Sequence, residues 1–325
     1  MSSNLKVPIP DAGISDDAEV QPEVSVLMPV FNAERYVAAA LESILAQSFR
    51  DFEFIVLDDG SSDSSLQILQ TFAIRDARVR VTSRSNRGLV STLNEMISMA
   101  RGGLIARMDA DDIAFPERLH CQVSFMQQHP EVVAVGSRAV LVDPDGLPLR
   151  TFIDNFTHDA IVKAMLSSEV GIVHPAAMIR RRVLECIGGY RSDFRHAEDL
   201  DLFLRLSEVG RLANIAEPLL RYRMNPTSVS HEHFVEQSVQ GRRAVAAAVE
   251  RMGLAPGVQP LTSSTQLVAP SKAQLHRKWS WWALEGGNLL TARKHALIAT
   301  AAEPFSRQNF KLLVCVARDC LRAIR

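Results

Sequence analysis

The feature that most constrains the fold is an alternation of strand-like and helix-like segments between Val24 and about Val135. Four segments typical of strands, VSVLMPV, FEFIVLDD, RVRVTS and LIARM, are separated by three segments whose apolar residues recur at helical spacing. The continuous apolar run VSVLMPV predicts a strand that is buried on both faces. Strands that alternate with helices predict an α/β fold with a mostly parallel, Rossmann-like sheet of βαβ units.

The second part of the chain predicts a different mixture of elements. The segment VVAVGSRAVLVDPDGLPLR predicts two strands around a Pro-Asp-Gly turn, and RLANIAEPLLRYRM predicts a short strand pair. The segments HDAIVKAMLSS and EDLDLFLRLSEVG predict helices. We expect a disordered tail at 1–23, followed by an α/β domain in two halves, 24–135 and 136–233. A helical C-terminal region is expected at 234–325, interrupted by a linker near 255–271.

Composition narrows the classes of function. The formal net charge of −1 gives the whole chain no electrostatic preference for nucleic acid. The sequence has no run of 18 apolar residues, no apolar signal-peptide core near its start, and only four scattered cysteines. These observations predict a cytoplasmic protein with neither a membrane-spanning helix nor a disulfide framework.

Polar side chains follow each of the first four predicted strands. In an open parallel sheet, ligands bind beyond the carboxyl ends of the strands, so these residues are candidate site residues. Folding stability alone does not require acidic loops at four successive strand ends. The candidates, in strand order, are Pro29, Val30, Asn32 and Glu34; Asp58 and Asp59; Asn86 and Gly88; and Asp109, Asp111 and Asp112.

The loops lack the glycine-rich phosphate cradles G-x-x-x-x-G-K-[ST] and G-x-G-x-x-G. A diphosphate would then need a hard cation, and Mg²⁺ or Mn²⁺ takes carboxylate ligands. Asp109 and Asp111 face one way around Ala110 if the chain there is extended, so both are candidate ligands. For Asp63 and Asp112 the alternative of helix capping or turn formation stays open.

The motifs together resemble a known family. The segment VSVLMPVFNAERYVAAALESILAQSFRDFEFIVLDDGSSDSS, followed by NRGLVSTLNEMISMARGGLIARMDADDIAFPERL, resembles the opening of family 2 glycosyltransferases of the GT-A fold. The resemblance rests on P-V-x-N, D-D-G-S-x-D, N-x-G and D-x-D-D in that order, from Val24 to about Val135 and more loosely to about Met224. The chain lacks the Q-x-x-R-W segment of some processive members, which favours a bacterial enzyme that adds single sugars.

The resemblance implies a nucleotide pocket at the first three strand ends. It implies that Asp59, with Asp58 beside it, accepts a hydrogen bond from the nucleobase, commonly uracil N3–H. It also implies that Asn86 and Gly88 let the chain pass close to the nucleotide. The remaining pocket residues that the resemblance implies are Pro29, Val30, Asn32 and Glu34.

The resemblance also implies where the reaction takes place. Asp109 and Asp111 match the D-x-D pair, with Asp111 as the direct ligand of Mn²⁺ or Mg²⁺ and Asp109 shared between metal and nucleotide-sugar. Asp199, near the start of a predicted helix from Leu200, matches the aspartate of the E-D motif, which is the general base. An inverting transfer needs one carboxylate to take the acceptor's proton and a cation to meet the charge of the leaving diphosphate. A plain helix cap is the alternative for Asp199.

Two further features lie near this predicted site. Arg221 and Arg223 resemble the family segment that supplies basic groups near the diphosphate, and surface charge is the open alternative. His174 precedes Pro175 and an apolar stretch; a place near the acceptor and a structural hydrogen bond are equally compatible with it.

The C-terminal segment 271–325 is basic, with ten Lys and Arg against three Asp and Glu, and carries all three tryptophans. Two interpretations stay open: peripheral contact with the inner face of a membrane, or a helical bundle whose tryptophans pack on the α/β domain.

The predicted activity is inverting transfer of a sugar from a UDP- or dTDP-sugar to a hydroxyl of a glycan or lipid-linked acceptor, in surface polysaccharide biosynthesis. A nucleotidyltransferase is the enzymatic alternative, although PVFNAERY lacks the Gly-rich, Lys/Arg-bearing loop usual for that class. A non-catalytic nucleotide-sugar-binding module is the other alternative, against which both acidic motifs are present.

Overall fold

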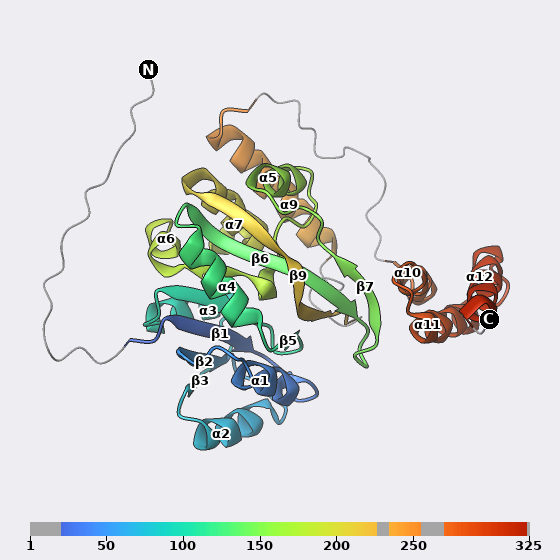
Figure 1. Cartoon of the computed structure of the whole chain (residues 1–325), viewed down its shortest axis with the longest axis horizontal. Helices are drawn as coiled ribbons and strands as arrows, with labels where there is room; N and C mark the ends of the chain where they lie inside the picture. The colour runs from blue at the N-terminus through green and yellow to red at the C-terminus, as the bar shows by residue number, and fades with distance from the viewer. Residues whose placement is uncertain (1–20, 226–233, 255–269, 324–325) are drawn as a thin grey trace, which may run out of the picture.

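The computed structural model describes residues 21–225, 234–254 and 270–323 (Figure 1). The predicted tail 1–23 and the predicted linker therefore lie almost wholly outside the described residues. The centre of the molecule is a nine-stranded mixed sheet of order β3-β2-β1-β4-β8-β6-β9-β5, with β7 paired to β6. The strands are β1 Val24–Val30, β2 Phe52–Asp58, β3 Val79–Ser83, β4 Leu104–Arg107, β5 Ile113–Ala114, β6 Val132–Val142, β7 Pro148–Phe152, β8 Met178–Arg180 and β9 Arg211–Arg223.

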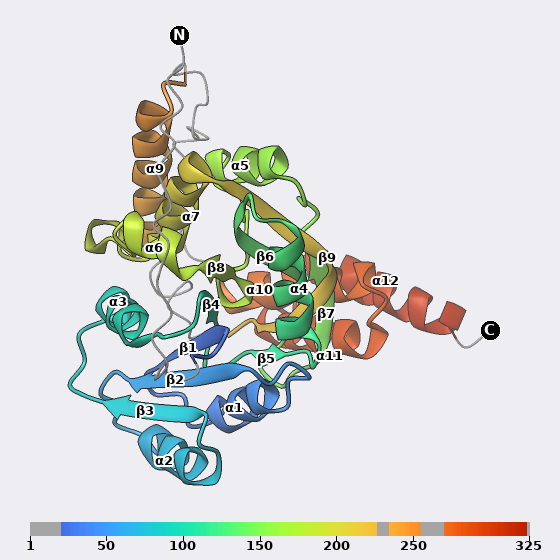
Figure 2. The same cartoon turned by 60° about the vertical axis from the view of Figure 1, so that its left-hand side comes forward.

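The predicted parallel unit forms the first half of the sheet. β1 pairs in parallel with β2 and β4, and β2 pairs in parallel with β3. Alternate side chains of β1 enter two different cores, since Val26 and Met28 pack with α1 (Val37–Leu45) while Leu27 packs with α3 (Leu89–Met99). The helix α2 (Ser65–Arg75) lies with α1 on the first face, and α3 covers the opposite face (Figure 2).

Beyond β4 the sheet is mixed. β8 runs antiparallel to β4 and β6, whereas β9 runs parallel to β6. The prediction of a short strand pair at RLANIAEPLLRYRM is wrong, because the segment is one strand, β9. Its register slips between Ile215 and Pro218, where two extra residues bulge from the ladder. Pro218 lacks a backbone donor and suits such a bulge, which is why the sequence there reads as a turn.

The helices of the second half fill the space around the mixed strands. α9 packs on α7, because Val245 and Ala248 share a core cluster with Leu202 and Leu206. The predicted helices at 158–168 and 198–210 are confirmed, the second ending before Gly210. These elements are α4 Arg118–Gln128, α5 His158–Leu166, α6 Arg181–Cys186, α7 Glu198–Val209 and α9 Phe234–Arg251, with single turns η1 His174–Ala176 and η2 Ser192–Phe194.

The last three helices, α10 (Lys272–Glu285), α11 (Leu289–Ala302) and α12 (Arg307–Ala323), form a third core beside β7 (Figure 1). Trp279 is 1% exposed and packs with Leu141 and Leu149 from β6 and β7. The packing of this tryptophan follows the second of the two interpretations of the C-terminal segment. The exposed residues of α12, among them Phe310 and Val314, do not belong to this core.

A buried carboxylate joins these helices to the turn between β6 and β7. Asp143 is fully buried and ion-pairs with Lys294, while its Oδ2 lies 3.1 Å from Nε2 of His295. Its Oδ1 accepts backbone N–H groups of Asp145 at 3.0 Å and Leu147 at 2.9 Å. These contacts hold the pKa of Asp143 well below its ordinary value, because hydrogen bonds and the Lys294 charge outweigh burial.

Candidate functional site

The acidic triad lies immediately after β4. Oxygens of Asp109, Asp111 and Asp112 all lie within 4.8 Å of one another. Asp112 is fully buried, and its Oδ1 accepts the backbone N–H of Arg223 at 2.7 Å. Its Oδ2 has no hydrogen-bond partner among the described residues. Asp112 therefore stands inside the cluster with the other two carboxylates and does more than shape a turn.

Burial and mutual repulsion raise the pKa values of two carboxylates of the triad. Burial and the charge of Asp109 raise the pKa of Asp111 to about 6. Burial and both neighbouring carboxylates raise the pKa of Asp112 well above its ordinary value. Arg107, which is 3% exposed, ion-pairs with Asp109, and the charges of Arg107 and Arg223 act on Asp111 without offsetting its burial. Three oxygen-bearing groups at this separation, one with an unpartnered oxygen, fit the ligand chemistry of a hard divalent cation.

The predicted base lies beside this cluster. α7 begins at Glu198, and the Oδ1 of Asp199 accepts the N–H of Leu200 at 2.8 Å. Burial raises the pKa of Asp199, the charge of Asp109 raises it further, and Arg107 opposes the shift. Burial and the charge of Asp199 raise the pKa of Glu198 to about 7. The structure thus brings the D-x-D and E-D motifs together from β4 and α7.

The third carboxylate of the E-D region has a different environment. Asp201 is fully buried and ion-pairs with Arg191 and Arg205, whose Nε lies 2.9 Å from Asp201 Oδ2. Arg205 also donates to the carbonyl oxygens of Ile187 and Gly189. Asp201 therefore holds the start of α7 to the preceding loop through these two arginines.

The loops after β1 and β2 are joined by reciprocal hydrogen bonds. Asn32, at φ +49°, accepts the N–H of Ser62 at 2.8 Å with its Oδ1. Glu34 accepts the N–H of Ser64 at 2.9 Å and donates its own N–H to Asp63 Oδ2 at 3.0 Å. Asp63 also accepts the N–H of Ser65, the first residue of α2, at 2.9 Å, but the N-cap position of this helix is Ser64. Pro29 and Val30 are the last residues of β1 and lead into this pair of loops.

The two aspartates after β2 hold the loop after β3. Asp59 accepts the N–H groups of Arg87 and Gly88, both at 2.9 Å, and ion-pairs with Arg84. Asp58 accepts from Ser61 N–H at 3.2 Å and Ser83 Oγ at 2.7 Å. Both carboxylates thus make protein hydrogen bonds, and contact with a nucleobase stays a prediction.

Gly88 and Asn86 lie where the loop after β3 passes closest to the loop after β2. Gly88 has φ +83° and precedes α3, a conformation that other residues adopt only with strain. Asn86 Oδ1 accepts the N–H of Gly88 at 3.2 Å. A Cβ on Gly60 would lie 2.7 Å from the backbone nitrogen of Asn86, so the two loops need glycine to approach this closely.

The two predicted arginines separate in space. Arg223 donates from Nε to the carbonyl oxygen of Asp111 at 2.7 Å and lies 4.5 Å from the centre of the Tyr36 ring. Arg221 is exposed and lies over Phe115, 5.3 Å from its ring centre. The structure therefore brings Arg223 to the acidic triad and leaves Arg221 at the surface of β9.

His174 lies near Arg107 and makes a structural hydrogen bond. Its Nε2 is 2.7 Å from the hydroxyl of Tyr190, and its ring meets Phe203 edge-on. Burial, followed by the charge of Arg107, lowers the pKa of His174 well below its ordinary value, so the ring is neutral. Sequence reasoning gave no role to Arg107, whose charge reaches Asp109, Asp199 and His174. Its place at the end of a buried strand, just before D-x-D, was the available signal.

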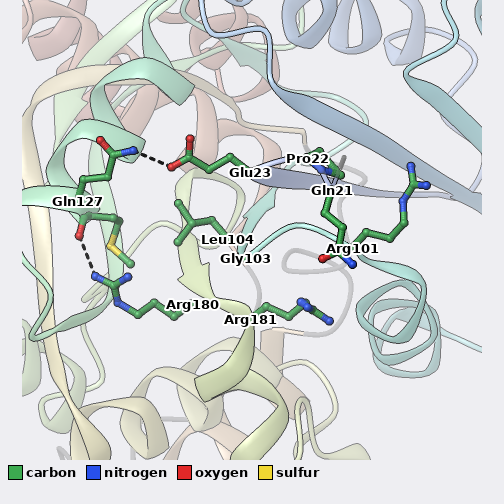
Figure 3. Close-up of a pocket in the computed structure, with 10 residues that line it drawn as sticks. Gln21, Pro22, Glu23, Arg101, Gly103, Leu104, Gln127, Arg180 and Arg181 are labelled. Carbon is green, nitrogen blue, oxygen red and sulfur yellow. Dashed lines mark hydrogen bonds between the residues drawn. The ribbon is translucent and has the colours of Figure 1, made fainter. Parts of the chain in front are cut away.

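A cavity of about 390 Å³ lies at the amino-terminal ends of β1 and β4, whereas the acidic triad follows the carboxyl end of β4 (Figure 3). Its lining includes Arg180, which donates to the carbonyl oxygens of Met126 and Val132, and Glu23, which accepts from Gln127 at 2.7 Å. These groups are engaged in the packing at the beginnings of β1 and β4. The cavity is therefore separate from the acidic site.

Comparison with known proteins identifies the family. Residues 25–188, half of the chain, match the family model described as glycosyl transferase family 2. The chain belongs to glycosyltransferase family 2. The putative glycosyltransferase EpsE of Bacillus subtilis is 33% identical over 238 residues, which cover 72% of this chain and 84% of that protein. The O-antigen biosynthesis glycosyltransferase WbnJ of Escherichia coli is 30% identical over 210 residues, covering 63% and 81%.

Solved structures show that this family 2 glycosyltransferase has the GT-A fold. S. aureus TarS 1–349 in complex with UDP-GlcNAc aligns with a TM-score of 0.57 at 16% identity, covering 93% of this chain and 92% of that one. The mannosyltransferase PcManGT from Pyrobaculum calidifontis, in complex with GDP-Man and Mn²⁺, aligns at 0.55 and 22%, covering 93% and 81%. The predicted family and GT-A fold are therefore confirmed, including the helical C-terminal region. The sheet itself is mixed beyond β4, where a mostly parallel sheet was predicted.

Proposed function

We propose that this glycosyltransferase moves a sugar, with inversion, from a nucleoside-diphosphate sugar to a hydroxyl acceptor. The observation that carries the proposal is the meeting of two acidic motifs from distant elements. The negative charge of Asp109, after β4, acts on Asp199 of α7, and the positive charge of Arg107 acts on both. An inverting transfer needs two such groups, one for the acceptor's proton and one for the diphosphate side of the donor.

Asp199 is the proposed general base. The acceptor oxygen attacks the anomeric carbon as its proton passes to a carboxylate oxygen of Asp199, and the bond to the diphosphate breaks on the opposite face. Its raised pKa favours this role, because a base with a pKa nearer neutrality accepts a proton more readily. Leu200 N–H fixes one carboxylate oxygen and leaves the other for the acceptor.

Asp111 and Asp109 are the proposed ligands of a divalent cation, Mn²⁺ or Mg²⁺, with Asp112 behind them. The crowded carboxylates and the unpartnered Oδ2 of Asp112 support this assignment. A bound cation would supply charge neutralisation for the diphosphate as the bond to the sugar breaks. Arg223 would add a fixed positive charge at the same end of the site, since its Nε already holds the carbonyl of Asp111.

The loops after β1, β2 and β3 are the proposed nucleotide pocket, within a donor half at 24–135 and an acceptor half at 136–233. The hydrogen bonds between these loops support a preorganised pocket for a UDP- or dTDP-sugar. TarS in complex with UDP-GlcNAc and PcManGT with GDP-Man support a nucleotide-sugar donor. The similarity to WbnJ, an O-antigen biosynthesis glycosyltransferase, supports a role in surface polysaccharide synthesis, with a glycan or lipid-linked acceptor. The pocket residues we propose are Pro29, Val30, Asn32, Glu34, Asp58, Asp59, Asn86 and Gly88, with Asp109 and Arg223 towards the diphosphate. Arg221 is left out of this set, because it lies exposed over Phe115.

A thermal-shift and donor-hydrolysis panel tests the proposal. Nucleotide sugars are screened with Mn²⁺, with Mg²⁺ and with a chelator. We expect a rise in Tm only when a nucleotide diphosphate and a cation are both present, and we expect the rise to be absent in Asp111→Asn. Asp154→Asn, whose side chain is 83% exposed, is the matched control. Stabilisation that is the same with and without cation would contradict the proposed metal site.

A further inference from the structure

The outer face of α12 carries apolar and basic side chains side by side. We define this face by Phe305, Arg307, Phe310, Lys311 and Val314. Phe305 is 100% exposed, Phe310 71% and Val314 53%, and both basic residues are exposed. Residues 307, 310, 311 and 314 are spaced by three and four positions, so they fall on one side of the helix. Apolar groups in such a row are a sign of an interaction surface.

The same helix already has a fully used inner face. Leu312 and Val316 are 0% and 4% exposed and pack into the third core with Trp279. The apolar residues of the outer face are therefore additional to those that the fold needs. In Figure 1 this helix lies at the edge of the molecule, on the far side of α11 from β7.

The electrostatic balance of this region is opposite to that of the catalytic domain. Segment 271–325 has ten Lys and Arg against three Asp and Glu, whereas the remaining chain has 26 against 34. Among the described residues, Arg307 and Lys311 take part in no ion pair. Nearby, Arg277 is partly balanced by Glu303 at 3.6 Å. The outer face therefore presents positive charge that nothing within the described structure neutralises.

A second feature adjoins this face. A cavity of about 380 Å³ between α10 and α12 is lined by Lys311, Arg277, Lys278 and Trp281, with two glutamine side chains. Lys278 lies 4.6 Å from the centre of the Trp282 ring. Lys311 belongs both to the cavity and to the outer face, so the two form one continuous basic and aromatic surface. Cations and tryptophan together suit the headgroup layer of a membrane.

We propose that the outer face of α12 and the adjoining cavity bind the surface of an anionic membrane. Phosphate headgroups would meet Lys311, Arg277 and Lys278, while Phe305 and Phe310 enter the boundary of the acyl chains. No helix within the described ranges is long and apolar enough to cross a bilayer, so the contact is peripheral. A second copy of this chain is a poorer occupant, because a two-fold interface would press this basic face against itself. The proposal goes beyond sugar transfer and does not depend on it.

Vesicle flotation with the full-length protein tests the proposal without measuring activity. Vesicles of phosphatidylcholine alone are compared with vesicles that contain about one third phosphatidylglycerol. We expect flotation with the anionic vesicles only, weakened by high salt because surface charge is screened. Absence of flotation overturns the proposal, whether the protein then remains monomeric or self-associates.

Substitutions on the outer face locate the contact. We expect Phe305→Ser with Phe310→Ser to weaken partitioning at least about tenfold, and Lys311→Gln to weaken it about fivefold. Ile74→Ser is the matched control, since Ile74 is 88% exposed on α2, away from this face. Circular dichroism and Tm verify that each variant is folded. Equal flotation of the wild type and the double phenylalanine variant, or an equal loss in the control, overturns the proposal.

Discussion

The guanidinium of Arg223 links two groups of carboxylates, and the electrostatic environments of the two groups differ in sign. In the first group, Asp111 and Asp112 have raised pKa values because they are buried beside like charges. In the second group, Asp143 has a lowered pKa because Lys294, His295 and two backbone N–H groups meet it. Arg223 touches both, donating to the carbonyl oxygens of Asp111 and Asp143.

The difference in pKa separates carboxylates that the fold leaves free to bind a ligand from carboxylates that stabilise the fold. A raised pKa means that the folded chain disfavours the charged form, which a cation or a proton then relieves. A lowered pKa means that the fold has already supplied the partners. The comparison predicts that substitutions in the first group change binding and catalysis, whereas substitutions in the second change stability.

The largest expected effect is the loss of turnover in Asp199→Asn, a member of the raised-pKa group. The amide cannot accept the acceptor's proton, so kcat falls about 1,000-fold, within the usual range for a general base. Because Asp199 is disfavoured in its charged form, Tm is unchanged or slightly higher. Initial rates, nucleotide affinity and Tm are measured together, with Asp154→Asn as the control. Turnover within a few-fold of wild type would remove Asp199 as the base.

The next effect is the loss of stability in Asp143→Asn. The amide turns a donor towards Lys294 or His295 and removes the charge, so the free energy of unfolding falls by about 3 kcal/mol. Asp145→Asn is the matched control two residues away, since Asp145 is 57% exposed and also pairs with Lys294. We expect it to cost less than about 1 kcal/mol. Denaturant melts measure the free energy of unfolding of both variants. Similar losses at Asp143 and Asp145 would contradict the stabilising role assigned to the buried carboxylate.

The smallest expected effect is the pH dependence of cation binding. With a pKa of about 6, Asp111 is protonated below that pH, and a cation must displace the proton. The apparent Kd for Mn²⁺ therefore rises as the pH falls, at least about tenfold between neutrality and about pH 5. Titration calorimetry at several pH values measures the change. A Kd that is constant over this range would mean that Asp111 is not a ligand.

Much of the first half of the fold could be predicted from the sequence. The apolar runs of β1 and β2 and the helical spacing after them specify βαβ units, and those units are observed in parallel register. The mixed half was less accessible. β5 is only two residues long, and β9 hides a bulge at Ile215–Pro218 that resembles a turn. Pairing between distant strands, such as β6 with β9, leaves little trace in local periodicity.

The candidate site was predictable in its residues and less so in their relations. Motif spacing indicated Asp109, Asp111 and Asp199, and the structure brings them together. Arg107 was missed because a basic residue inside a strand-like run gives no motif. The sequence does not distinguish the positions of Arg221 and Arg223, because both follow the same strand pattern. Only the contacts of Arg223 with Tyr36 and Asp111 at the end of β9 set the two arginines apart.

The partners of Asp143 are supplied very late in the chain. Lys294 and His295 lie 151 and 152 positions after it, in α11. During synthesis, a nascent chain that has not yet emerged as far as α11 lacks both of them. The side-chain contacts that hold the turn beside Arg223 can therefore form only after α11 has been synthesised.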